Sequence, residues 1–87
     1  MYLDLAQLKN LRKKYFLMQY DMCRYIGVSD VAYRTWELRV RRPNDEHYKV
    51  LKSIFSVLNK FKAEILDRES ALEILDRELI LDDEKQD

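Results

Sequence analysis

Residues 19–37 decide the fold of this 87-residue chain, and they read QYDMCRYIGVSDVAYRTWE. Apolar side chains recur at helical spacing over residues 19–26, enough for two turns of helix. Gly27 can adopt the left-handed conformation that ends a helix, and Ser29 is a good N-cap for the next one. The stretch therefore predicts two short helices joined by a brief turn, the second of them over residues 30–38.

Further helices on both sides of this stretch are predicted by the composition. The chain has one Gly and one Pro, too few to punctuate a sheet protein. Leucines on one face predict a helix over residues 2–15, and another helix begins at about residue 46, after a basic loop that ends at Pro43. The sequence thus predicts an all-α protein.

An apolar stripe with alternating spacings of three and four runs through the C-terminal half, as in a coiled coil. It consists of Leu51, Ile54, Leu58, Phe61, Ile65, Leu72, Leu75 and Leu79. Arg68 fills the one gap, where we expect it to pair with Glu64 or Glu69. We expect the first part of the stripe to pack on the domain core. The apolar side chains beyond Phe61 would be exposed to water unless something else buries them, and we expect a second copy of the chain to do so. The predicted dimerisation residues are Leu58, Phe61, Ile65, Leu72, Leu75 and Leu79.

The pattern leaves two interpretations open for this C-terminal half. Ser70 and Glu73 fit a capping box, which would start a new helix after a break near residues 67–70. One continuous helix and two helices bent at Ser70 are both compatible with the pattern. In either case we expect residues 1–60 to form the main domain and residues 61–87 an acidic helical extension.

The formal net charge of zero hides two opposite parts. Residues 1–62 carry thirteen Lys and Arg against six Asp and Glu, a net charge of +7. Residues 63–87 carry three against ten, a net charge of −7. Such an asymmetry is expected where one part meets phosphate and the other does not, so it favours a nucleic-acid partner for the basic part.

Several other classes of protein are disfavoured. Cys23 is the single cysteine, so it forms neither an intrachain disulfide nor, by itself, a zinc site. No apolar run approaches the ~18 residues that span a bilayer, and the expected location is the cytoplasm. No carboxylate pair, Cys/His set, Gly-rich phosphate loop or metal-ligand spacing is present, so we expect neither an enzyme nor a cofactor.

Residues 12–43 resemble the Cro/C1-type (XRE family) helix-turn-helix domain. That family has a helix beginning with Gln, a small residue four places on, a Gly-Val-Ser turn, an apolar residue, a Trp-Glu pair and a basic loop closed by Pro. The counterparts here are Gln19, Cys23, Gly27-Val28-Ser29, Tyr33, Trp36-Glu37 and Arg41-Arg42-Pro43, in register without a gap. The resemblance implies a lambda-repressor-like fold of four to five helices, here with an extended C-terminal helix.

The resemblance also implies a sequence-specific regulator of transcription, a repressor that binds double-stranded DNA as a homodimer. The second helix of the motif would lie in the major groove, with residues near its N-terminus on base edges. The implied base contacts are Asp30, Val31, Arg34 and Thr35. The implied phosphate contacts are Gln19, Ser29, Arg39, Arg41 and Arg42.

Three departures from the family pattern lie at turns. Met18 stands where an oxygen-bearing cap is usual, Phe16 where Gly is frequent, and Leu38-Arg39 where Asn-Gly usually closes the helix. The loops beside the motif are therefore expected to differ from the family's. The long acidic C-terminal half also keeps a second hypothesis open, in which the C-terminal helix binds a protein partner, as in an antitoxin or antirepressor.

Overall fold

The computed structural model describes residues 3–80, apart from the side chain of Ile80. In this range the chain forms helices and no strand, so the all-α prediction is confirmed. The α-helices are α1 (Leu5–Lys14), α2 (Gln19–Ile26), α3 (Asp30–Glu37), α4 (Asp45–Lys60) and α5 (Arg68–Leu75), and the π-helix η1 (Asp76–Ile80) continues α5.

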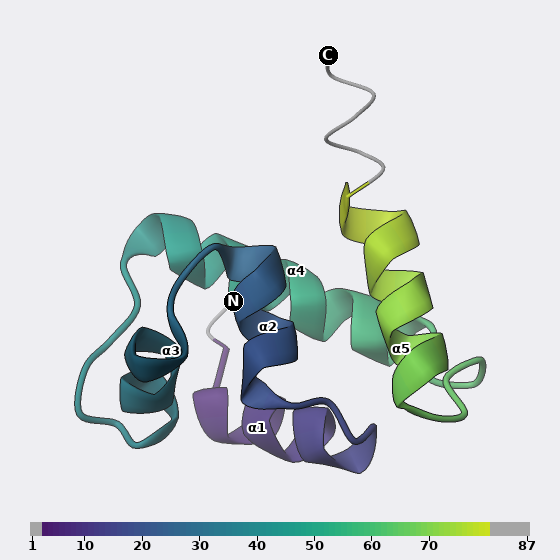
Figure 1. The fold of residues 1–87 in the computed structure, drawn as a ribbon, viewed down its shortest axis with the longest axis horizontal. Coiled ribbons are helices and arrows are strands. Elements are labelled where there is room, and N and C mark those ends of the chain that lie inside the picture. Colours follow the sequence, from purple (N-terminus) through teal and green to yellow (C-terminus); the bar gives the residue numbers. More distant parts are fainter. Residues whose placement is uncertain (1–2, 81–87) are drawn as a thin grey trace.

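The longest helix, α4, holds the others together. It packs against α1, α2 and α5, while α3 packs against α1 and α2. Figure 1 shows α4 running across the molecule, with α3 near one end and α5 near the other. One core results, because buried residues come from every α-helix. They include Leu8, Met22, Tyr33, Leu51, Ile54, Leu58, Ala71 and Leu75.

Side chains at the helix starts accept hydrogen bonds from backbone N–H groups that have no partner within the helix. The N-caps Asp4, Ser29, Asn44 and Asp67 do this for α1, α3, α4 and α5. Met18, the N-cap of α2, has no side-chain oxygen. Instead, the carboxylate of Asp21 accepts a hydrogen bond from the backbone N–H of Met18 at 2.7 Å.

The C-terminal half is broken, and the interpretation as one extended helix is wrong. The α4 helix ends at Lys60, and residues 61–67 form a turn before α5 begins. The new helix is capped by Asp67 rather than by Ser70, because the Asp67 carboxylate accepts from the Ser70 N–H at 2.8 Å. The Ser70 hydroxyl accepts in return from the Asp67 N–H at 3.0 Å. Ser70 is thus the second partner of a capping box that starts three residues earlier.

Residues 61–80 share the core of the first sixty residues. Ala71 and Leu75 are completely buried there, and Ile65 is buried in the turn before α5. The hydroxyl of Tyr25 in α2 also donates a hydrogen bond to the carboxylate of Asp76 at 2.7 Å. Within the described residues, the expected boundary at residue 60 therefore does not separate two cores.

Candidate nucleic-acid interface

The stretch that decides the fold forms two helices joined by a tight turn. Gly27 ends α2 with φ of +84°, in the left-handed region, and its N–H donates to the carbonyl of Cys23 at 2.7 Å. Two residues later, the hydroxyl of Ser29 accepts from the Ala32 N–H at 3.2 Å and starts α3. The turn thus depends on a residue without a side chain followed by one with a short polar side chain.

The α3 helix has a buried side and an exposed side. Tyr33 and Trp36 are buried, with their rings edge to face at 5.9 Å between centroids. Asp30, Val31 and Arg34 are exposed, and their spacing places them together on the outward side. Three of the four predicted base-contacting residues therefore lie on one open surface.

Thr35, the fourth of these residues, is half-buried. Its hydroxyl donates a hydrogen bond to the carbonyl of Ala32 at 2.6 Å, within its own helix. Ser and Thr hydroxyls in helices commonly bond backwards in this way. The hydroxyl proton of Thr35 is therefore already engaged within the helix.

The loop after α3 turns sharply without a glycine. Arg39 takes φ of +63°, and the carbonyl of Thr35 accepts hydrogen bonds from the N–H groups of Val40 at 2.9 Å and Arg41 at 3.3 Å. A left-handed residue usually follows the end of a helix because it lets the next N–H groups reach the last carbonyls. Arg39 performs this role despite its Cβ.

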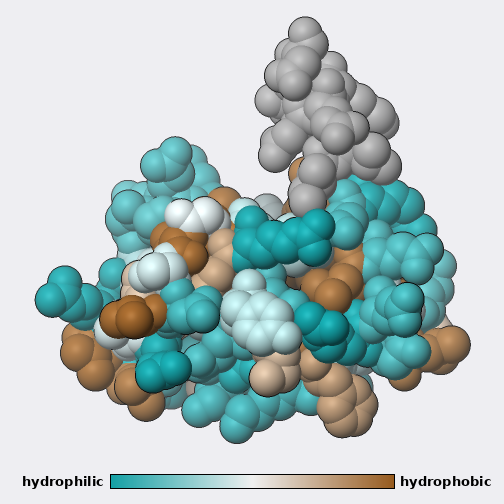
Figure 2. Space-filling model, viewed as in Figure 1, coloured by the Kyte–Doolittle hydropathy of each residue, from teal (hydrophilic) through white to brown (hydrophobic). Residues whose placement is uncertain are grey.

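The three predicted phosphate-contacting arginines are brought together by this loop. Arg39, Arg41 and Arg42 are exposed and line one hollow, which two carboxylates also border. Leu38 and Val40 are exposed on the same loop and Val31 is 70% exposed on α3. Figure 2 shows apolar surface at this end of the molecule, beside hydrophilic side chains. The surface therefore combines positive charge with apolar contact area.

Gln19 and Ser29 occupy the first turn of α2 and the cap of α3. The side-chain amide of Gln19 donates a hydrogen bond to the carboxylate of Glu37 at 2.9 Å, which the sequence did not predict. An amide has two N–H donors, so one remains for another acceptor. Ser29 is exposed, and its hydroxyl can still donate while its oxygen caps α3.

A buried ion pair supports this surface from the side of the core. The guanidinium of Arg12 in α1 donates to both carboxylate oxygens of Glu37, at 2.9 and 3.0 Å, and also to the carbonyl of Leu17 at 2.7 Å. The side chains of Arg12 and Glu37 are 8% and 5% exposed. The pair thus ties the end of α3 to α1 and to the turn before α2.

This role of Arg12 is not predicted from the sequence, in which Arg12 contributes only to the basic charge of residues 1–62. One signal was available, because Arg12 lies four residues after Leu8 and three before Tyr15, on the apolar side of α1. A charged residue at a core position needs a partner, since an unpaired buried charge is costly. The sequence does not say which acid provides it.

The ionisation of Glu37 follows from its partners. Burial disfavours the charged carboxylate, but hydrogen bonds from Arg12, Gln19 and Tyr33 outweigh this effect, so the pKa of Glu37 lies below its ordinary value of 4.5. The carboxylate therefore remains charged at neutral pH and keeps its bonds to the three donors.

Cys23 is buried between the two helices of the stretch. Burial, together with the neighbouring Asp30, raises the pKa of its thiol to about 11. At neutral pH the thiol is protonated, and only a thiolate is a good nucleophile or metal ligand. This side chain therefore acts as a packing residue.

A second ion pair joins α2 to α5, and it corrects the expectation for Arg68. Its guanidinium donates to both carboxylate oxygens of Asp21, at 2.9 and 2.7 Å, rather than pairing with Glu64 or Glu69. Asp21 is buried, whereas Arg68 is partly exposed. Arg68 interrupts the apolar stripe because it fixes α5 onto α2 of the same chain.

The predicted dimerisation residues pack largely within the chain itself. Leu58, Ile65 and Leu75 are buried in its core, while Phe61, Leu72 and Leu79 are partly buried against that core. The stripe does not form one seam, because the turn over residues 61–67 folds α5 back onto α4, and Arg68 joins α5 to α2. The expectation that a second copy must cover the stripe is therefore wrong for its buried members.

The described residues, 3–80, form neither a membrane-spanning helix nor a cluster of metal ligands. No helix among them is long and apolar enough to cross a membrane. Across residues 3–80, no group of three or more His, Cys, Asp and Glu side chains is placed to hold a metal ion.

Comparisons of this chain with protein-family models, with curated proteins and with solved structures each find no match.

Proposed function

We propose that this protein is a sequence-specific regulator of transcription that binds double-stranded DNA through a lambda-repressor-like helix-turn-helix. The observation that carries the proposal is the outward surface of α3, where Asp30, Val31 and Arg34 are exposed beside a loop with three exposed arginines. The major groove of B-DNA admits an α-helix whose first residues contact base edges. The α3 helix is the recognition helix in this proposal.

The exposed residues of α3 match the groups that bases present in the major groove. The guanidinium of Arg34 suits O6 and N7 of guanine, which it would contact with two hydrogen bonds. Val31 suits the methyl group of thymine, and the carboxylate of Asp30 can accept from N4 of cytosine. Thr35 adds a methyl group at the edge of the same surface.

The residues around α3 would position the duplex through its phosphates. Arg39, Arg41 and Arg42 follow α3, and Gln19 and Ser29 stand at the starts of the two helices. Contacts of this kind fix orientation and carry no sequence information. They release counterions, so binding should weaken steeply as salt rises.

We further propose that the regulator is a repressor and acts as a homodimer, since two copies double the contacts with a site made of two half-sites. In this proposal we do not assign Leu58, Ile65 and Leu75 to the dimer surface, since they are buried within each copy.

Selection from a random duplex library tests the proposal. We expect enrichment of one family of sites with two inverted half-sites, and binding that falls as salt is raised. As a control, the variant Lys60→Ala changes a basic residue on α4 rather than α3 and should select the same family. Failure to enrich any sequence, with the unmodified chain folded, would exclude sequence-specific duplex binding.

A protein-interaction module of the antitoxin or antirepressor type is the second candidate. The observation that favours it is the outer side of α5, where Glu69 and Glu73 are exposed and form no ion pair within residues 3–80. In this case the C-terminal helix would bind a basic protein partner through charge. The library selection separates the two candidates, because only the first requires enrichment of a DNA sequence.

A further inference from the structure

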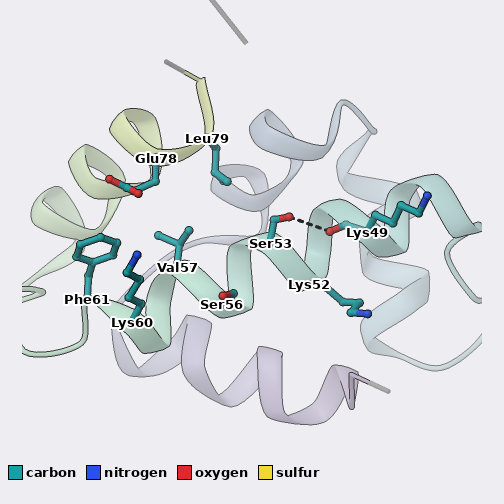
Figure 3. A pocket seen from close by; sticks show the side chains of 9 residues that line it. All are labelled: Lys49, Lys52, Ser53, Ser56, Val57, Lys60, Phe61, Glu78 and Leu79. Atoms are coloured by element: carbon teal, nitrogen blue, oxygen red, sulfur yellow. Dashed lines mark hydrogen bonds between the residues drawn. The ribbon is translucent and has the colours of Figure 1, made fainter. Parts of the chain in front are cut away.

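A shallow groove lies between α4 and the C-terminal π-helix. Its apolar floor is formed by Val57 and Phe61 at the end of α4 and by Leu79 of η1. Lys49, Lys52 and Lys60 also line it, and Figure 3 shows Lys60 beside Phe61 and the other two toward the opposite end of this stretch of α4.

The groove opens on the outer side of α4. Leu51, Ile54 and Leu58 form the buried side of this helix, which packs on the core. Lys49 and Lys60 are exposed and lie nearly half a turn away from these residues around the helix. Lys49 and Lys60 therefore lie across α4 from its buried side, and Val57 and Phe61 lie between the lysines and that side.

The described part of the chain leaves the lysines of the groove without ion pairs. Within residues 3–80, no ion pair involves Lys49, Lys52 or Lys60. Glu78 is the one acid among the described lining residues, and its carboxylate pairs with Arg77 at 3.1 Å. The guanidinium of Arg77 and the ammonium of Lys60 both lie over the ring of Phe61, 5.3 and 5.4 Å from its centroid.

DNA bound along α3 does not account for this surface. The lysines belong to the basic part of the chain, yet Lys49 and Lys60 lie on the side of α4 opposite its buried residues rather than on α3 or its loop. A phosphate backbone would also leave the apolar floor of Val57, Phe61 and Leu79 without a matching group. Apolar surface next to charge is typical of protein interfaces, where a hydrophobic centre is surrounded by a polar rim.

We propose that this groove docks an acidic segment of another protein, one that inserts a large apolar side chain between its carboxylates. The carboxylates would pair with Lys49, Lys52 and Lys60, and the apolar side chain would cover the floor. A second copy of this chain fits less well, because a dimer formed here would place its two α3 helices on opposite sides. The preference for another protein over a second copy rests on the DNA-binding proposal, whereas the groove itself uses none of the α3 surface.

The first test measures binding of a fluorescent synthetic peptide of Glu, Leu and Ala that forms an acidic amphipathic helix. We expect saturable binding to the full chain and a loss of roughly tenfold in affinity for the double variant Lys49→Glu/Lys60→Glu. The matched control Lys13→Glu/Lys14→Glu changes the same charge on α1 and should bind almost as well as the unmodified chain. Equal affinity of the groove variant and the unmodified chain would overturn the proposal.

Changes in the probe separate the two parts of the groove. A peptide with Gln in place of Glu should lose the charge contribution, and one with Ala in place of Leu should lose the apolar contribution. If the peptide without Leu binds equally well, the floor has no role and the proposal fails. Displacement of the peptide by non-specific duplex DNA would instead identify the groove as a phosphate surface.

A second measurement needs no variant and therefore does not depend on variant folding. The peptide is titrated into the isotope-labelled full chain, and changes in amide chemical shift are mapped by NMR. We expect the largest changes over residues 53–61 and 76–79. Changes concentrated elsewhere, or no saturable binding up to about 1 mM peptide, would contradict the assignment of this groove as the docking site.

Discussion

The substitution Leu75→Ala tests whether α5 belongs to the core of a single chain. Leu75 is 0% exposed and packs in the core that α2 and α4 share with α5. Replacing a buried Leu by Ala removes apolar contacts and leaves a cavity, which together cost about 2.7–5 kcal/mol. We therefore expect the free energy of unfolding to fall by about 3 kcal/mol. For a domain of this size the Tm should fall by roughly 12–24 °C.

Urea unfolding followed by circular dichroism at two protein concentrations measures this loss. The control is Leu66→Ala, because Leu66 precedes the same helix but is 85% exposed. We expect this control to change stability by no more than about 0.5 kcal/mol. Since the partners of Leu75 are in its own chain, the loss for Leu75→Ala should not depend on protein concentration.

Two results would refute this reasoning. In the first, Leu75→Ala is as stable as Leu66→Ala, which would mean that α5 does not pack on the core. In the second, the unfolding midpoint of the unmodified chain rises with protein concentration and this dependence disappears in Leu75→Ala. A second copy would then bury Leu75, as the coiled-coil interpretation of the stripe predicted.

Three further substitutions test the turn before α2, the buried ion pair and the basic loop. Phe16 has φ of +60°, a conformation that glycine adopts more easily, and its side chain is 70% exposed. Phe16→Gly should therefore raise the free energy of unfolding by about 0.5–1 kcal/mol in urea titrations. The control Phe16→Ala keeps the Cβ and should not raise it. The lowered pKa of Glu37 stabilises the fold above pH 4.5, and this contribution is lost as pH falls through the folded-state value. Glu37→Gln should therefore have a lower free energy of unfolding than the unmodified chain at pH 7, because Arg12 loses its charged partner. The difference in unfolding free energy between the two proteins should narrow below pH 4.5. A difference that stays constant with pH would contradict the lowered pKa of Glu37. Arg41→Ala should weaken binding to all duplexes alike and lower the slope of log K against log salt by about one, whereas an unchanged slope would exclude a phosphate contact.

Local sequence signals are sufficient to predict the two helices and the turn formed by residues 19–37. Gly27 and Ser29 have the conformation and the capping role expected of them, and α2 has the predicted bounds. Such features depend on neighbours a few residues away, so the residue types alone indicate them. Phe16 and Arg39, where glycine is usual in the family that this sequence resembles, both have positive φ. Their backbone conformation is set by the surrounding structure rather than by their own preference.

Contacts between distant segments were not predictable in the same way. Arg12 and Glu37 are 25 residues apart, Asp21 and Arg68 are 47 apart, and no spacing rule connects such pairs. Apolar periodicity shows which side of a helix is buried but not what covers it. The stripe therefore predicts a second copy as its cover, whereas in the structure the turn over residues 61–67 lets the chain itself cover it. At the candidate interface the exposed residues of α3 were predicted, but the bond from Gln19 to Glu37 was not.

The most direct test of α3 as the recognition helix is the base preference of Arg34→Ala. Its affinity, and that of the unmodified chain, would be measured for the selected site and for each single base-pair change in it. If Arg34 contacts a guanine, the variant should lose discrimination at one base pair of each half-site, at a cost of about 1–3 kcal/mol there, and keep it at the other positions. A uniform loss of affinity across all sites, or an unchanged base preference, would contradict the assignment of α3 to the major groove.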